Sequence, residues 1–246
     1  MRGLRCERSW HIFFLAICLI CPRADAGPSL LYYVSTQEGS ATPPAGQASE
    51  QLIPTSTGYS AITFPGIASV AFNDGGHVVN GTNNYATGGG YAAPILPNGN
   101  PYSDNYYSTE TGSIVFNFSY EQCYIGILWG SVDTEANGNL LTFYNNGSMV
   151  GQISGAELIT LASNVENFYV GSQVFGGTFY LNVTGVNGGE FNEMIASSGV
   201  PSFEFGQVTV IGQNTSEGAN PIPEPPFIFY FTLLIFVVSR FILMHP

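Results

Sequence analysis

The sequence predicts an all-β fold, an antiparallel β-sandwich or jelly-roll-like domain, set between an amino-terminal signal peptide and a carboxyl-terminal membrane segment. Two observations predict the sandwich. Between residues 59 and 212, short runs of β-branched and aromatic residues recur at near-regular spacing, and Gly, Asn and Pro interrupt them as turn residues do. Only residues 155–161 have the composition of a short helix. Many short strands separated by turns are typical of sandwiches.

The amino terminus predicts a secretory signal peptide over residues 1–26. Its parts are three arginines, an apolar run and an Ala-x-Ala site: Arg2, Arg5 and Arg8, residues 12–21, and Ala24 with Ala26. A short apolar run between a basic start and small residues is typical of a signal that is removed on export. We therefore expect the Sec translocon and signal peptidase as partners, and Gly27 as the first mature residue.

Residues 27–58 are interpreted as one strand followed by a flexible arm. The strand is predicted at residues 30–34, which are apolar and aromatic. Residues 40–50 are rich in Ala, Pro, Ser and Gly, a composition that favours a loop. The sandwich itself is predicted to span residues 59–212, and a polar linker with prolines follows at residues 213–222.

Two consecutive runs form the predicted centre of the sandwich. Residues 113–120 alternate large apolar side chains with smaller or polar ones, as a half-buried strand does. Residues 122–130 are almost continuously apolar, which predicts a central strand covered on both faces. Trp129 in this run is therefore expected to be a core residue.

Turn residues predict two hairpins and a bulge. Asn145 to Ser148 and Asn187 to Gly189 each place Asn and Gly between apolar runs, and both residue types tolerate the positive φ that tight hairpins require. Gly206 interrupts the last apolar stretch, residues 202–211, where a β-bulge is expected.

Composition excludes nucleic acid as a partner. All five Lys and Arg residues lie outside residues 27–222, whereas of the 17 acids only Glu7, Asp25 and Glu224 do, so this segment has 14 acids and no Lys or Arg. Nucleic-acid binding requires a basic footprint, so we expect none. Cys123 is the only cysteine of the segment, so no internal disulfide is expected, and we interpret it as a small buried apolar residue.

No catalytic constellation is evident, and we predict that the chain is not an enzyme. His77 is the only histidine between residues 27 and 222, and we interpret it as a surface residue of a turn despite nearby Asp74. A glycoside hydrolase requires only two carboxyl groups at a fixed separation. The acids that qualify by type alone are Asp133, Glu135, Glu190, Glu193 and Glu204.

Two binding sites are candidates. Asp133 and Glu135 follow the predicted central strand, and carboxylate oxygens are ligands for calcium, so the two residues are a candidate calcium site. No complete calcium-binding loop is present in the sequence. No cofactor other than calcium is expected. Tyr102, Tyr106 and Tyr107 lie in a loop-like stretch, where exposed rings would stack on sugars.

The carboxyl terminus is predicted to be a sorting signal over residues 223–246. Pro223, Glu224 and Pro225 precede an apolar run at residues 227–238, and Arg240 follows. This order resembles the PEP-CTERM signal of Gram-negative bacteria, which an exosortase reads. The resemblance implies transient anchoring in the inner membrane and then display at the cell surface. Family tails usually end in several arginines, whereas this one has Arg240 alone.

Blocks within residues 62–211, of which Trp-Gly-Ser-Val-Asp at 129–133 is the most specific, resemble exosortase-dependent surface proteins with a single β-sandwich domain. The resemblance implies export and display, so we expect a surface or extracellular-matrix protein with a structural or interaction role. A carbohydrate-binding module that recognises extracellular polysaccharide, with or without calcium, is the alternative, and a carbohydrate-active enzyme ranks below it. A GPI-anchored protein is a further alternative, which Arg240 and the Pro-Glu-Pro triplet disfavour.

Overall fold

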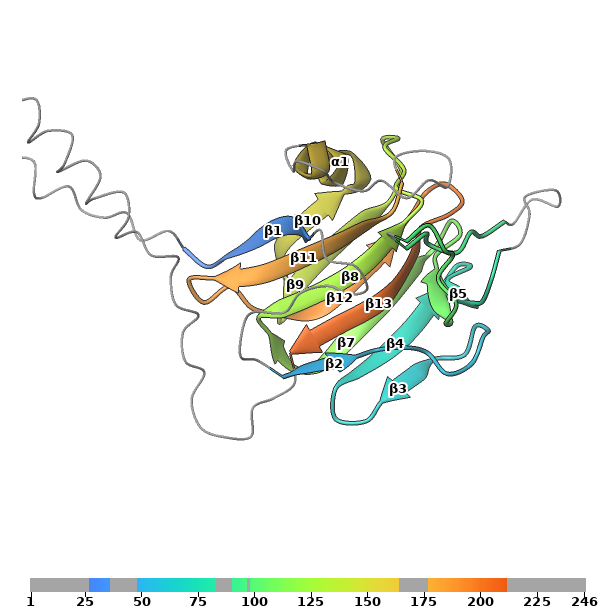
Figure 1. The fold of residues 1–246 in the computed structure, drawn as a ribbon. Helices are drawn as coiled ribbons and strands as arrows, with labels where there is room; N and C mark the ends of the chain where they lie inside the picture. Colours follow the sequence, from blue (N-terminus) through green and yellow to red (C-terminus); the bar gives the residue numbers. More distant parts are fainter. Residues whose placement is uncertain (1–26, 36–47, 83–89, 97, 164–176, 212–246) are drawn as a thin grey trace, which may run out of the picture.

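The computed structural model describes residues 27–35, 48–82, 90–96, 98–163 and 177–211, which form two antiparallel sheets and one short helix (Figure 1). The predicted all-β sandwich is therefore confirmed. The predicted signal peptide, the linker and the sorting signal with Pro223, Glu224, Pro225 and Arg240 lie outside the described residues. Within the ranges that are described, no helix is long and apolar enough to cross a bilayer.

Sheet A contains seven strands, and sheet B contains six. In sheet A the order is β1, β11, β8, β13, β6 and β5, with β2 paired to the far end of β13; the bounds are β1 (Ser29–Ser35), β2 (Ser49–Gln51), β5 (His77–Val79), β6 (Tyr106–Ser108), β8 (Tyr124–Gly130), β11 (Phe179–Val186) and β13 (Glu204–Ile211). In sheet B the order is β10, β9, β12, β7, β4 and β3; the bounds are β3 (Ile62–Phe64), β4 (Ala68–Asn73), β7 (Ser113–Gln122), β9 (Leu140–Asn145), β10 (Ser148–Ser154) and β12 (Phe191–Ser197).

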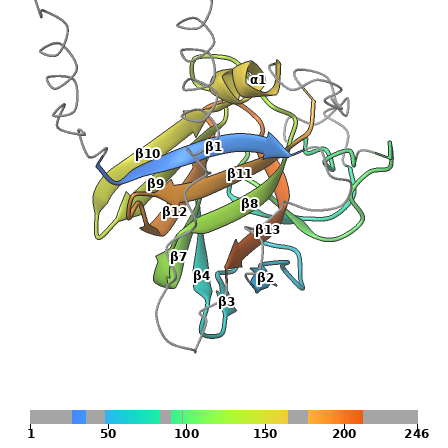
Figure 2. The ribbon, with the colours of Figure 1, turned by 60° about the vertical axis from the view of Figure 1, so that its left-hand side comes forward.

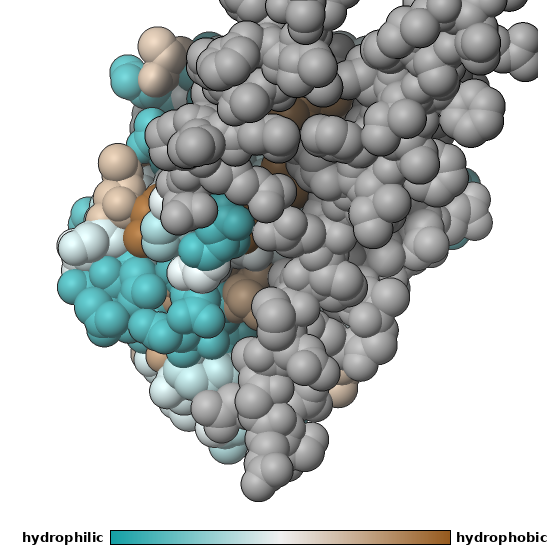
Figure 3. Space-filling view, turned by 90° about the vertical axis from the view of Figure 1, so that its left-hand side faces the viewer, coloured by the Kyte–Doolittle hydropathy of each residue, from teal (hydrophilic) through white to brown (hydrophobic). Residues whose placement is uncertain are grey.

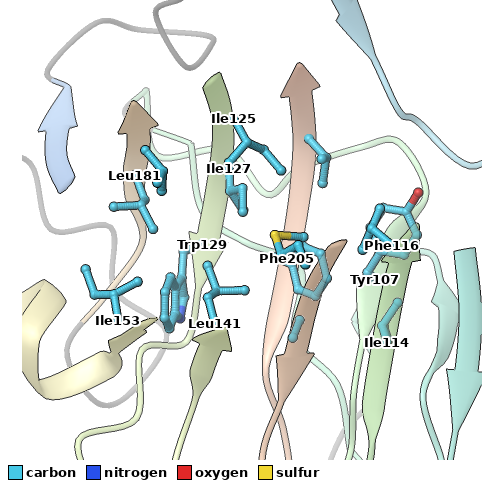
Figure 4. Close-up of a cluster of buried hydrophobic side chains, with 14 of the residues drawn as sticks. Tyr107, Ile114, Phe116, Ile125, Ile127, Trp129, Leu141, Ile153, Leu181 and Phe205 are labelled. Carbon is cyan, nitrogen blue, oxygen red and sulfur yellow. The ribbon is translucent and has the colours of Figure 1, made fainter. Parts of the chain in front are cut away.

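The main core lies between the two sheets and is mostly aliphatic and aromatic (Figure 4). On β7 the alternation predicted from the sequence is present, because Ile114 and Phe116 are fully buried while Asn117 is exposed. Every residue of β8 is buried, as predicted for a central strand, and Trp129 faces the core. The period-two pattern and the continuous apolar run therefore both report burial correctly.

The first strands belong to the sandwich rather than to a separate arm. Along its whole length β1 pairs with β11, and β2 pairs with the end of β13. Val34 and Leu52 are buried in the main core. The sandwich therefore begins with β1, earlier than the predicted boundary at residue 59, while residues 36–47 of the predicted arm lie outside the described part.

One of the two predicted hairpins is present. β9 and β10 pair across the turn at Asn146 and Gly147, whose φ angles are 49° and 79°. Asn187 and Gly188 also adopt positive φ, but the strands that they join lie in different sheets, because β11 pairs with β1 and β8 while β12 pairs with β7 and β9. The second hairpin prediction is wrong, since a turn signal reports only a local chain reversal and not the pairing of the flanking strands.

The predicted short helix is α1 (Gly155–Ser163), which lies against β1 and β10 at one side of the sandwich (Figure 2). Its start is a capping box. The backbone N–H of Ser154 donates to Glu157 Oε2 (2.8 Å), and the backbone N–H of Glu157 donates to Ser154 Oγ (3.3 Å). The Ser154 backbone N–H and Ser154 Oγ (2.8 Å) both donate to Glu157 Oε2, and these two bonds lower the pKa of Glu157. Leu158 and Ala162 anchor the helix in the core.

Candidate functional site

The outer face of sheet A carries a second buried layer. Residues 90–96, named the strap here, run over this face beside β5 and β6, at the right of Figure 1. Beneath it lies a small cluster, named the outer cluster, that is separate from the main core: Val79, Ala93, Tyr102, Tyr106, Leu128 and Tyr180. A sheet face that the chain covers with its own loop is the most distinctive feature of the described structure.

A row of four residues crosses this outer face beside the cluster. His77 is opposite Ser108, Ser108 is opposite Glu204, and Glu204 is opposite Gly130, on strands β5, β6, β13 and β8. The neighbours of these residues on the same strands, such as Val78 and Phe205, face the main core. Because side chains alternate along a strand, the four residues share the outer face. We refer to them as the outer row.

The strap is fixed to the outer face at several points, which include bonds from Ser202 Oγ to the Gly90 carbonyl (3.3 Å) and from the Tyr102 backbone N–H to the Pro94 carbonyl (2.8 Å). The backbone N–H of Ala92 donates to Glu204 Oε1 (3.1 Å), and the backbone N–H of Ile95 donates to Thr178 Oγ1 (3.1 Å). Pro94 lies on Gly130, where an added Cβ would come within 2.8 Å of Pro94 Cγ. A glycine at that position therefore lets the strap approach the sheet closely.

Glu204 is the least expected residue of this layer. Its side chain is fully buried, Oε1 also lies within hydrogen-bonding distance of Ser202 Oγ, and Oε2 has no hydrogen-bond partner among the described residues. Burial raises the pKa of this carboxyl to about 8, and the bonds from Ser202 and Ala92 oppose that rise only in part. Glu204 is therefore mostly protonated at neutral pH.

Asp133, a predicted calcium ligand, lies in a separate hydrogen-bonded group with Asn139. Asn139 Nδ2 donates to Asp133 Oδ2 (3.2 Å), while Asn139 Oδ1 accepts from the Asp133 backbone N–H (2.8 Å) and from Trp129 Nε1 (3.3 Å). Burial, and then the charge of Glu135, raise the pKa of Asp133 to about 6. Glu135 is exposed, and the described ranges contain no group of three His, Cys, Asp or Glu side chains arranged to hold a metal.

The three tyrosines predicted to be exposed are buried. Tyr102, Tyr106 and Tyr107 are between 0 and 4% exposed, so the exposed-loop prediction is wrong for them. Tyr106 and Tyr107 lie on β6, where Tyr106 OH donates to the Gly81 carbonyl (2.5 Å) and Tyr107 OH donates to the Leu52 carbonyl (3.0 Å). The polar stretch around them indicated a loop, but the tyrosines supply apolar area beneath the strap and between the sheets.

His77 is also buried, contrary to its interpretation as a surface turn residue. It is 5% exposed, and its Nδ1 lies 2.7 Å from the Gly75 carbonyl oxygen. The Tyr59 ring stacks on its imidazole with 4.7 Å between centroids, and Tyr91 meets it edge-on at 6.1 Å. Glu110 Oε1 is 3.8 Å from His77 Nε2. A single ring of this group, Tyr59, is largely exposed, at 65%.

The remaining acids weighed as catalytic residues lie elsewhere. Glu193 is on β12 in sheet B. Glu190 lies beside Glu121, and burial together with this hydrogen-bonded neighbour raises the pKa of Glu190. Asn146 and Asn192 bond to each other, and Asn146 Nδ2 also donates to Glu121 Oε1 (3.4 Å). On the face of the molecule that Figure 3 shows, the coloured residues are mostly hydrophilic. The five acids of the sequence-based set therefore do not converge on one site.

Sequence reasoning missed the contacts of the outer layer. It assigned no role to Ser202, Thr178 or Ala92, and it identified Glu204 only by residue type. Comparisons with protein-family models, with curated proteins and with solved structures find no match to this chain. The geometry of the described residues is therefore the main basis for functional argument, together with the terminal signals of the sequence.

Proposed function

We propose that this chain is exported, processed at its carboxyl terminus by an exosortase, and displayed as a surface or extracellular-matrix protein with a structural or interaction role. The observation that carries the proposal is the order of features along the chain. An Ala-x-Ala signal precedes a β-rich segment without Lys or Arg, and the Pro223-Glu224-Pro225 triplet, an apolar run and Arg240 follow it. The inner membrane is then a transient partner.

The buried acids are consistent with a structural role. Asp133 and Glu204, the two acids with the largest upward pKa shifts, are at most 8% exposed and engage neighbouring backbone and side-chain groups. Substrate would have to displace covering chain to reach either carboxyl. The proposal therefore assigns no catalytic activity to the domain.

Mass spectrometry of the mature chain from its own host tests the proposal. The expected chain begins at Gly27 and lacks most of residues 227–246. An Arg240→Gln variant is expected to be retained or processed poorly, because Arg240 is the only basic residue after the apolar run. Intact tail peptides in the surface fraction would contradict processing, and normal maturation of the variant would remove the role of Arg240.

A second candidate function, recognition of a neutral extracellular polysaccharide, is favoured by Tyr59. One face of its ring stacks on His77, and the exposed remainder is available to a sugar ring, with Glu110 beside His77 as a hydrogen-bond acceptor. Fourteen acids without Lys or Arg disfavour anionic polymers unless a divalent cation bridges them. Pull-down with the host polysaccharide, with and without EDTA, tests this candidate. Unchanged binding by Tyr59→Ala would exclude this site.

A further inference from the structure

We propose that Glu204 is a proton-controlled latch that holds the strap over the outer face of sheet A, and that loss of its proton releases the strap. The inference goes beyond the proposed function, because it concerns a conformational change of the domain wherever the protein acts. It rests first on position. Glu204 is fully buried at the centre of the outer row, and its Oε1 accepts the backbone N–H of Ala92 in the strap at 3.1 Å.

The described structure offers the ionised form no compensating charge. No Lys or Arg occurs between residues 27 and 222, so a buried carboxylate here cannot be neutralised by either side chain. Oε2 of Glu204 and Oγ of Ser108, which are neighbours in the outer row, are both buried and have no hydrogen-bond partner in the described ranges. A buried polar atom without a partner is costly, and an unpaired charge costs far more.

Of the charged and titratable groups around Glu204, Asp133 makes its ionisation harder. Asp133, from the loop after β8, repels the carboxylate, and Tyr106 on β6 has its pKa raised by burial and by Glu204. Farther along the outer row, His77 on β5 faces Glu110, and Tyr91 of the strap faces Tyr106. The bonds from Ala92 and Ser202 favour the carboxylate, but desolvation outweighs them.

Water is the remaining source of solvation, and the strap separates Glu204 from it. Lifting the strap breaks the bonds from Ala92 to Glu204 and from Ile95 to Thr178, and removes Pro94 from Gly130. It also exposes the outer cluster, which includes Leu128 and Tyr102. A rise in pH from 4.5 to about 8 therefore increasingly favours the lifted strap, in which Glu204 is ionised and an apolar surface of sheet A is exposed.

Hydrogen exchange of the full chain in detergent micelles tests the latch. Protection factors, corrected for the intrinsic effect of pH, are measured at pH 6 and pH 9 for peptides that contain the Ala92 and Ile95 amides. Because burial under the strap raises the carboxyl pKa from 4.5 to about 8, protection should fall about tenfold per pH unit up to pH 8 and then level off, so we expect a loss of about a hundredfold between pH 6 and pH 9. Peptides from β9 and β10 in sheet B are the internal control and should keep their protection.

Two variants complete the experiment. Glu204→Gln keeps the acceptor oxygen but cannot ionise, so strap protection should change by less than about twofold between the two pH values. Glu110→Gln, which removes a partly exposed acid outside the latch, should behave like the unmodified chain. If Glu204→Gln does not fold, the pH dependence of strap exchange in the unmodified chain decides. A loss of protection that ends near pH 8 supports the latch, and a loss that ends elsewhere overturns it. Retained protection at pH 9, or an equal loss in Glu204→Gln, would overturn the proposal.

Discussion

The inner and outer faces of sheet A are both buried, but by different means. Phe205 on the inner face packs against rings from both sheets, including Tyr107 at 5.2 Å and Phe116 at 6.1 Å. Its neighbour Glu204 faces the opposite side and is covered by the strap, which holds it through one backbone bond. The inner face is thus stabilised by many apolar contacts, whereas the outer face combines a small apolar cluster with a few polar contacts, of which the bond to Glu204 varies with pH.

The largest expected effect is on the inner face. Phe205→Ala should lower the free energy of unfolding by about 3–5 kcal/mol, because it removes a fully buried ring and leaves a cavity. Urea denaturation measures this change. Leu31→Ala is the matched control, since Leu31 is 53% exposed and should cost less than about 0.5 kcal/mol. Equal effects of the two substitutions would contradict the assignment of Phe205 to the main core.

On the outer face, the effect of Glu204→Gln should depend on pH. The carboxyl pKa is raised from 4.5 to about 8, so the folded state binds more protons than the unfolded state between these values. Stability therefore falls as pH rises through this window, by up to ~1.4 kcal/mol per pH unit. Glu204→Gln lacks this loss and should exceed the unmodified chain by roughly 2–4 kcal/mol at pH 9.

Urea denaturation from pH 4 to pH 9 measures the two slopes. Asp133, whose pKa is raised from 3.8 to about 6, adds a second loss that is complete near pH 6 and that remains in the Glu204→Gln variant. A variant with the same slope as the unmodified chain above pH 6 would show that Glu204 is not the titrating group.

Asn139, which directly precedes β9, should have an intermediate effect. Its amide bonds to Asp133 and to the indole N–H of Trp129, whose ring is in the main core. Asn139→Ala should cost about 2–3 kcal/mol, because buried donors lose their acceptor. Asn139→Asp tests the specificity of the amide. It keeps the acceptor oxygens but places a second carboxyl beside Asp133, so its cost should grow as pH rises above 6.

Gly130→Ala probes the fit of the strap with a smaller change. The new methyl group would lie within 2.8 Å of Pro94 Cγ, so Pro94 must shift. We expect a loss of about 1–2 kcal/mol and a lower protection of the Ala92 amide at every pH. Gly185, where an added Cβ meets the Gly189 carbonyl oxygen, is a control outside the strap. Gly185→Ala should destabilise the domain without a selective loss of strap protection.

The contrast also explains what could be predicted from the sequence. The inner face follows from local periodicity, so the alternation of β7 and the apolar run of β8 identify Phe116 and Trp129 as core residues. The outer face depends on contacts between residues far apart in the chain, such as Ala92 and Glu204. No local pattern reports that residues 90–96 will cover a sheet.

The wrong predictions have the same cause. The tyrosines near residue 105 lie in a polar stretch that reads as a loop. The pairing of β6 with β5 and β13 buries Tyr106 and Tyr107, and Tyr102 lies against Gly206 of β13. The turn at Asn187 and Gly188 was recognised, but the sheet that each flanking strand joins is decided by its buried face. The candidate site therefore could not be predicted from the sequence, whereas the fold class could.

The smallest expected effect is at Tyr59, the exposed end of the outer face. Tyr59→Ala removes a ring that is 65% exposed and stacks only one face on His77, so the loss of stability should be at most about 1 kcal/mol.

Tyr106→Phe is the informative counterpart. It keeps the buried ring of the outer cluster and deletes only the hydroxyl that donates to the Gly81 carbonyl at 2.5 Å. That deletion leaves the half-buried Gly81 carbonyl without its donor and should cost about 1–1.5 kcal/mol in urea denaturation. A larger loss for Tyr59→Ala than for Tyr106→Phe would mean that the exposed ring, and not the layer beneath the strap, stabilises this side of sheet A.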